Sequence, residues 1–167
     1  MKLLKFTLLV LLLLFTACER WLDSSYSIHI KNNSEYTISS YFALGIEGRR
    51  GEGRTAFPDT TLSFDRQLVG YSTPPGALSR RAFSTFPPEW WFERLPQDTL
   101  SIFIFNQAVL NRYSWREIQQ GYKILQRYDL SLDDLRKLHN RFDFPEIPFP
   151  PDERMRYMRM YPPFRTY

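Results

Sequence analysis

Hydrophobic residues are distributed along this chain in two ways, a continuous run near the start and short alternating stretches after it. The run extends from Phe6 to Phe15, is interrupted only by Thr7, and follows the basic residues Lys2 and Lys5. A membrane-spanning helix needs about 20 apolar residues, and this run is much shorter. A basic start followed by such a run is typical of a secretory signal, which we place at residues 1–17.

Alternation of apolar and polar residues after the signal predicts short strands. Residues 26–31 are predicted to form a half-buried strand, because Ile28 and Ile30 alternate with polar residues. The turn-forming stretch 32–35 separates this strand from residues 36–44, which we predict to return as its antiparallel hairpin partner. Further short strands are predicted at three places: 62–68, 77–83 and 122–130.

Residues 100–105 form the strongest predicted strand of the chain. Two isoleucines would face one side of a sheet and two phenylalanines the other: Ile102, Ile104, Phe103 and Phe105. Because both sets are apolar, this strand is predicted to be central in its sheet and covered on both faces.

Helices are predicted from capping boxes, in which a serine and an acid three residues later each accept a hydrogen bond from the other's backbone N–H. The pairs are Ser114 with Glu117 and Ser131 with Asp134. Gly121 would end the first helix. A third short helix is predicted over 88–95, because proline is favoured in a first helical turn.

These elements predict an α+β fold: a single antiparallel-β-rich, sandwich-like domain with two or three short helices. The globular domain is predicted to span 26–144 and to follow a tether at 18–25. Residues 145–167 are rich in proline, which cannot donate to a sheet ladder. We therefore predict a Pro-rich extended tail that lies on the domain or is loose.

The end of the apolar run, Phe15-Thr16-Ala17-Cys18, resembles the lipobox of bacterial lipoproteins, with Phe15 in place of the usual leucine. The resemblance implies cleavage between Ala17 and Cys18 and lipidation of the Cys18 thiol, and two or three acyl chains anchor stably where one does not. The alternative is an incidental cysteine beside an ordinary cleavage site, which bulky Phe15 disfavours. Cys18 is the single cysteine of the chain, and lipidation would remove an unpaired thiol from an oxidising compartment.

Composition and net charge limit the kinds of partner that the exported part is expected to bind. Removing 17 of the 167 residues leaves 150, the size of one domain. The chain has 22 basic and 18 acidic residues, and loss of Lys2 and Lys5 leaves 20 − 18 = +2. No block of basic residues follows the signal, so nucleic acid is not an expected partner. The aromatic content of 17% and the 12 prolines predict a small aromatic core and many loops.

A further resemblance is carried by six segments of the exported part: 27–34, 58–60, 98–105, 113–115, 122–135 and 160–163. These segments resemble a family of small uncharacterised lipoproteins from Bacteroidota-type bacteria. The resemblance covers most of the exported part and supports lipidation, but it implies no activity.

Two patterns suggest ligand chemistry, and the sequence around each argues against it. Residues 51–56 fit the G-x-G-x-x-A of dinucleotide sites, but Pro58 follows where a helix should begin. The two histidines are His29, on the polar face of a strand, and His139, at a helix end; their spacing does not suggest a zinc site. We therefore expect no nucleotide, no cofactor and no metal.

Four acids are candidates for an acid/base pair: Glu89, Glu93, Asp133 and Asp134. Each also fits a first-turn or exposed helical position, where an acid favours the helix dipole. We favour that structural role and predict no catalytic residue.

Aromatic and hydroxyl side chains supply the other candidate sites. Trp90 and Trp91 are candidates for an aromatic surface that binds sugar or peptide, with packing of the 88–95 helix as the alternative. Thr60 and Thr99 lie in short Asp-Thr sequences that resemble O-glycosylation sites of exported proteins from such bacteria.

Together these features predict a lipid-anchored cell-envelope protein that acts as a binding or interaction module and is not an enzyme. A carboxylate-dependent envelope hydrolase and a purely structural lipoprotein are the alternatives. The expected partners are the membrane, through the N-terminal lipid, and an envelope protein or glycan. Glu19 follows Cys18 without a run of acids, which by analogy with sorting rules favours the outer membrane and its periplasmic face.

Overall fold

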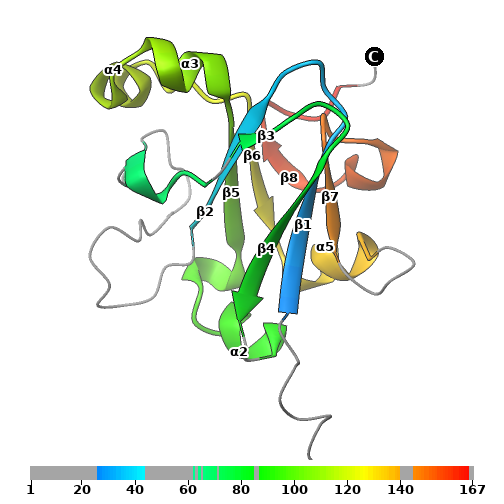
Figure 1. Cartoon of the computed structure of the whole chain (residues 1–167). Coiled ribbons are helices and arrows are strands. Elements are labelled where there is room, and N and C mark those ends of the chain that lie inside the picture. Colours follow the sequence, from blue (N-terminus) through cyan, green and yellow to red (C-terminus); the bar gives the residue numbers. More distant parts are fainter. Residues whose placement is uncertain are drawn as a thin grey trace, which may run out of the picture.

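The structure, a computed structural model, describes residues 26–43, 62, 64, 66–70, 72–84, 87–139 and 145–165 (Figure 1). Its strands are Tyr26–Asn32 (β1), Ile38–Ala43 (β2), Ser72–Thr73 (β3), Leu78–Ser84 (β4), Leu100–Asn106 (β5), Gln126–Leu130 (β6), Glu146–Phe149 (β7) and Arg159–Tyr161 (β8). The α-helices are Pro88–Phe92 (α2), Gln107–Arg112 (α3), Trp115–Gln120 (α4) and Leu132–Lys137 (α5). Short 3-10 helices cover Arg66–Leu68 (η2), Pro96–Asp98 (η3) and Glu153–Met155 (η4).

The strands form two sheets that pack face to face. The smaller sheet has the order β4-β1-β7 and the larger one the order β3-β2-β5-β6-β8. Neighbouring strands are antiparallel except β1 and β7, which run parallel with His29 opposite Glu146. The predicted α+β, antiparallel-β-rich single domain is confirmed.

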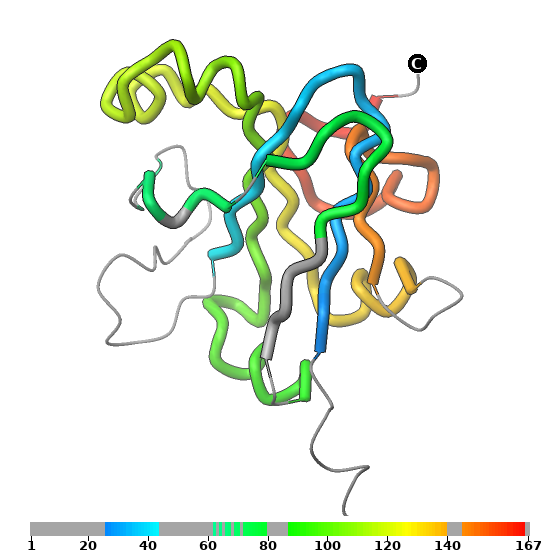
Figure 2. Tube along the Cα trace, viewed as in Figure 1, coloured from blue at the N-terminus to red at the C-terminus, as the bar shows by residue number. Residues whose placement is uncertain are grey.

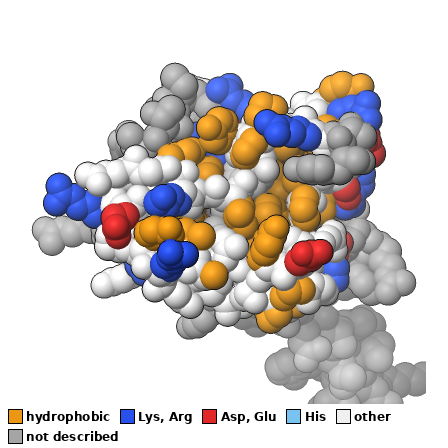
Figure 3. All heavy atoms as spheres, turned by 90° about the horizontal axis from the view of Figure 1, so that it is seen from above, with side chains coloured by type: hydrophobic (Ala, Val, Ile, Leu, Met, Phe, Trp, Pro, Cys, Tyr) orange, Lys and Arg blue, Asp and Glu red, His pale blue; other side chains and the backbone are white. Residues whose placement is uncertain are grey.

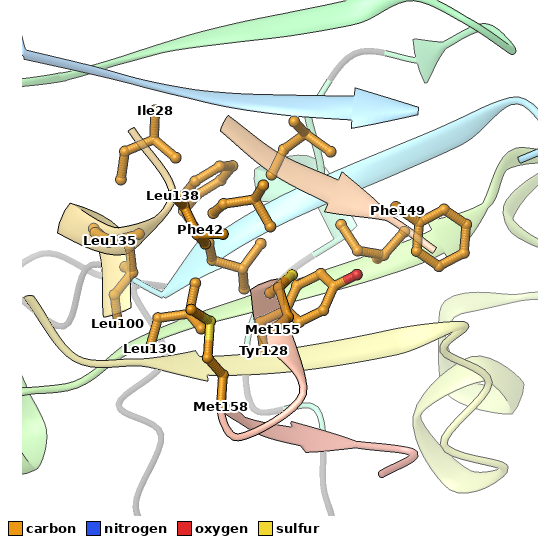
Figure 4. Close-up of a cluster of buried hydrophobic side chains, with 14 of the residues drawn as sticks. Ile28, Phe42, Leu100, Tyr128, Leu130, Leu135, Leu138, Phe149, Met155 and Met158 are labelled. Atoms are coloured by element: carbon orange, nitrogen blue, oxygen red, sulfur yellow. The ribbon is translucent and has the colours of Figure 1, made fainter. Parts of the chain in front are cut away.

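The main hydrophobic core lies between the two sheets (Figure 4). Strands on both sides supply its side chains, which include Ile28, Ile30, Phe42, Leu100, Ile102, Tyr128, Leu130, Ile147 and Phe149. Helices α2 and α5 close one end of this core with Trp91, Phe92 and Leu135. Full burial of a large apolar side chain contributes about 1.5–3 kcal/mol, so this layer is the main source of stability.

A second core covers the opposite face of the larger sheet. Phe103 and Phe105 of β5 point into it, whereas Ile102 and Ile104 point into the core between the sheets. Leu110 of α3 and Ile118 of α4 cover this second face. The prediction that β5 is central and buried on both faces is confirmed.

Capping residues set the helix starts as predicted. Ser114 and Glu117 form a complete capping box at α4, as do Ser131 and Asp134 at α5. Gly121 is the C-cap of α4. Helix α3 was not predicted; its N-cap is Asn106, whose side chain accepts a hydrogen bond from the Ala108 N–H at 2.8 Å.

The predicted hairpin of residues 26–31 with 36–44 is wrong. β1 and β2 are both strands, but they belong to different sheets, and β1 pairs with β4 and β7 instead. The turn between them is a corner from one sheet to the other. Its anchor is the buried Asn32 amide, which donates to the carbonyl oxygens of Tyr36 at 2.7 Å and Thr73 at 2.9 Å.

The predicted boundary between a globular domain and a tail at residue 145 also needs correction. The segment 145–165 adds β7 to one sheet and β8 to the other. It also places Met155 and Met158 in the main core, together with two residues of β7. Pro148 is tolerated because β7 is an edge strand, where a missing N–H need not break a ladder. The signal and the tether, residues 1–25, lie outside the described residues.

Candidate functional site

The two ends of the sandwich differ in the elements that close them. The basal end is where β1 begins and where α2 and α5 close the core; it is the lower end in Figure 1. The distal end is opposite and carries the turn 33–37 and the segments that follow β7 and β8. Figure 2 shows that the turn 33–37 runs beside the turn 74–77 there, and backbone hydrogen bonds join Asn32 to Gly76 and Ala77.

A groove of about 510 Å³ opens at the distal end, between the ends of the two sheets. Its lining residues come from four separate parts of the chain: Tyr36, Leu125, Gln126, Phe149, Pro150, Pro151, Pro162, Pro163 and Arg165. Figure 3, which views this end, shows hydrophobic side chains gathered across the face. Ligand sites typically enclose about 300–1,000 Å³ and are mostly apolar, so the groove has the size and character of one.

The groove walls are rigid because folded elements fix them. The carbonyl of Tyr36 is held by Asn32, and the Asn33 N–H donates to the Phe149 carbonyl at 2.6 Å. The Leu125 N–H donates to Ile104 of β5 at 2.8 Å. Four of the nine lining residues are prolines, whose rings have almost no freedom to lose when a ligand binds.

Polar groups in the groove are few and are not acidic. The buried Gln126 side chain donates to the Pro162 carbonyl at 2.8 Å and so ties β6 to the segment after β8. Arg165 is exposed and makes no ion pair within the described part of the chain. None of the described residues that line the groove is acidic, so the face that they present to a ligand is apolar and positive.

A second, more open groove of about 580 Å³ lies beside β3 and α3. Ser39, Ser72 and Gln107 line it together with Arg66. The Ser39 hydroxyl donates to the Gln107 side-chain oxygen at 2.5 Å, and the Gln107 amide donates to Asn111 at 2.9 Å. Ser39 and Gln107 are therefore engaged with each other, and the groove is the more open of the two, which makes it the weaker candidate.

A buried polar cluster lies on the outer face of the larger sheet. The Arg127 guanidinium donates to Asp129 at 2.9 Å, and both side chains are almost fully buried, at 3% and 5% exposure. Ser101 donates to the same carboxylate at 2.5 Å. Burial lowers the pKa of Arg127, but the hydrogen bonds that its guanidinium makes with Tyr122 and Asp129, together with the negative charge of Asp129, outweigh this effect, so the pKa lies above its usual range. No sequence pattern predicted this cluster, although Arg127 and Asp129 alternate with apolar residues of β6.

The predicted aromatic surface is only partly available. Trp91 is buried in the main core, with 8% exposure. Trp90 is half-buried against the same core, contacts Trp91 edge to face at 5.4 Å, and is covered by the Arg94 guanidinium at 3.9 Å. Both tryptophans therefore stabilise the basal end, and the helix-packing alternative accounts for their positions.

The four candidate acids form exposed ion pairs or cap a helix. Glu89 and Asp133 each lie 2.8 Å from Arg136, and this exposed pairing joins α2 to α5. Asp134 completes the cap of α5, and Glu93 lies 3.6 Å from Arg94. A backbone hydrogen bond is the main cause that keeps the pKa of Glu89 below its usual range. None of these acids lines either groove.

The other predicted residues lie apart from the groove. His29 is half-buried on β1 and His139 is exposed after α5, and the described residues contain no cluster of side chains suited to a metal. Thr99 is half-buried and its hydroxyl donates to Gln97 at 2.8 Å. Ala17, Cys18, Thr60 and the stretch 51–56 lie outside the described residues.

The groove was not predicted from the sequence because its residues are distant along the chain. Tyr36 was placed in a predicted strand, and Phe149, Pro150, Pro162 and Pro163 in a predicted tail. The high proline and aromatic content is the one sequence signal that agrees with a groove lined by rings. It does not say which rings come together.

Comparisons with known proteins do not extend this picture. No protein family, no curated protein and no solved structure matches the chain. Within the described ranges, no helix is long and apolar enough to span a bilayer.

Proposed function

We propose that this protein is a lipid-anchored binding module of the bacterial cell envelope and that the distal groove is its binding site. The observation that carries the proposal is the position of the groove. It opens at the end of the sandwich opposite the start of β1, the strand that follows the proposed lipid on Cys18.

The length of the tether supports this arrangement. Tyr26 follows Cys18 by eight residues, so the chain between them spans at most about 29 Å. A lipidated Cys18 would keep the basal end near the membrane surface. The distal groove would then face away from that membrane, towards other envelope components.

Binding is a better account of the structure than hydrolysis. The candidate acids are engaged in ion pairs or helix caps at the basal end, away from the grooves. The distal groove offers rigid apolar walls and one cation, which suit recognition of a ligand. We assign the chain no reaction, and we place it at the outer membrane, with the periplasmic face favoured.

Two measurements test the proposal. Mass analysis of the full-length protein purified from bacterial membranes should show acyl chains on Cys18; an unmodified cysteine or an intact leader would contradict the anchor. A photo-crosslinking residue at Pro163 should then give a discrete product in intact cells. The same residue at exposed Glu93 of the basal end is the matched control. Equal products from both positions, or none from Pro163, would contradict a distal binding site.

A further inference from the structure

We propose that the distal groove binds the carboxyl terminus of a partner polypeptide, with an apolar last side chain between the rings and the terminal carboxylate on Arg165. This inference rests on the binding role proposed above and adds the chemistry of the ligand. Three properties of the groove lead to it: its charge, its scarcity of free backbone donors and the rings that form its walls.

The charge of the groove selects an anion. Among the described residues that line the groove, Arg165 is the one that carries a charge, and it forms no ion pair with any of the others that the structure describes. A guanidinium presents several N–H donors in a plane and pairs with both oxygens of a carboxylate. A ligand without an anion would leave this cation unused, and a cationic ligand would be repelled.

The scarcity of free backbone donors favours a chain end over an internal segment. Four of the nine lining residues are prolines and have no N–H group, and the N–H groups of Tyr36 and Leu125 already donate to Ser34 and Ile104. The side-chain amide of Gln126 already donates to Pro162. An internal segment would bring peptide groups into the groove from both directions, and buried peptide groups need hydrogen-bond partners. A terminal residue carries its apolar side chain and its anion together, so it brings the fewest peptide groups.

The rings that form the walls favour a compact side chain over a long acyl chain. Tyr36 is 50% exposed at the rim and Phe149 is buried at the floor. Flat rings of this kind pack well against an aromatic or branched aliphatic group. Ligand pockets usually bury most of the surface of their ligand. A long acyl chain would extend beyond a groove of this size and leave much of its length in water, whereas a single side chain fits within it.

The test uses the full-length protein and short synthetic peptides in NMR titrations. The probes are Gly-Gly-Ser-Phe as the free acid, the same peptide as its C-terminal amide, Gly-Gly-Ser-Ser as the free acid, and dodecanoate. The signals followed are the Gln126 side-chain amide and the Tyr36 ring. We expect the phenylalanine acid to shift both signals and to bind about fivefold more tightly than its amide, the size of an exposed charge-assisted contact.

Substitutions then assign the contacts. R165Q should lower the affinity of the acid to that of the amide and leave the amide unchanged. Y36S should weaken both peptides equally, since it removes a wall of the groove and no charge. R136Q, at the basal end, should change neither.

The inference is overturned if the acid and the amide bind alike, if R165Q preserves their difference, or if the serine-terminated acid binds as well as the phenylalanine acid. It is also overturned if dodecanoate alone shifts the groove signals, which would assign the groove to lipids. Absence of any shift with all four probes would likewise reject it. The crosslink at Pro163 is independent of these outcomes, so a failed peptide test and a failed binding role are distinguishable.

Discussion

The basal and distal ends of the sandwich are closed by different means. At the basal end, helices α2 and α5 cover the core, and Arg136 is paired with Glu89 and Asp133 at 2.8 Å each. At the distal end, proline and aromatic rings surround a groove, and Arg165 has no acidic partner among the described residues. The charges of the basal end thus stabilise the fold, whereas the cation of the distal end is the group that we propose to bind a ligand.

Removing the segment that builds the distal end should have the largest effect. A chain that stops after Pro145 loses β7 and β8 and the core residues Ile147, Phe149, Met155 and Met158. Each buried side chain contributes about 1.5–3 kcal/mol, and a domain of this size has only about 5–15 kcal/mol in total. We expect no cooperative thermal unfolding by near-UV circular dichroism. A chain that lacks only residues 166–167 is the control, and equal unfolding temperatures of the two would show that the segment is not part of the core.

Arg127 is the counterpart of Arg165, an arginine whose partner lies within the fold. Arg127→Met leaves Asp129 buried with its charge unpaired, which costs about 3–5 kcal/mol. Urea denaturation should show this loss. The double variant R127M/D129L removes both charges and should recover most of it. A single variant within about 0.5 kcal/mol of the parent would mean that water reaches Asp129.

The helix cap at the basal end should contribute less. Ser131→Ala removes the hydroxyl that accepts the Asp134 N–H, and loss of an N-cap costs about 1 kcal/mol. The measurement is again urea denaturation. Ser131→Thr keeps the hydroxyl and should retain most of the stability, so equal losses for both substitutions would argue against capping.

Substitution of the exposed arginines Arg136 and Arg165 should have different effects on the stability of the fold. Arg136→Gln should lower the free energy of unfolding by at most about 1 kcal/mol, as is usual for exposed ion pairs, and high salt should reduce the difference. Arg165→Gln should leave stability unchanged, because no described residue pairs with it. A larger loss for Arg165→Gln than for Arg136→Gln would reverse the comparison of the two ends.

The smallest effect concerns the pH response of α4. Hydrogen bonds from Ser114 hold the pKa of Glu117 below its usual value of 4.5. Because the folded-state pKa is depressed, this group stabilises the fold above its unfolded pKa and loses that contribution as the pH falls through the folded pKa. Ser114→Ala should raise the pKa of Glu117 towards 4.5, as followed by NMR titration of its side-chain carbon. An unchanged pKa would show that the hydrogen bond from the Ser114 hydroxyl is not made in solution.

Local signals predicted much of the fold. The two serine–acid pairs fixed the starts of α4 and α5, because a capping box satisfies backbone groups within four residues of each other. The two apolar faces of residues 100–105 identified β5 as a central strand, since that pattern requires cover on both sides. In both cases the decisive contacts are near in sequence or belong to one strand.

The wrong predictions concern features that depend on contacts between residues far apart in the sequence. Turn-forming residues at 32–35 are compatible with a hairpin and with a corner between two sheets. The buried side chain of Asn32 stabilises the corner, because it donates hydrogen bonds to Tyr36 and Thr73. Proline in residues 145–151 argued against a strand, but an edge position accommodates Pro148. The groove depends on all of these contacts, so its composition was visible in the sequence and its location was not.

The parallel pairing of β1 with β7 has a consequence for the newly made chain. His29 of β1 lies opposite Glu146 of β7. The parallel partner of β1 is therefore synthesised 146 − 29 = 117 residues after β1 itself. Pairing over such a separation is slow, and the smaller sheet cannot be completed until Glu146–Phe149 has been synthesised. For the exported protein proposed above, this delay would help to keep the polypeptide unfolded until it has passed through a translocation channel.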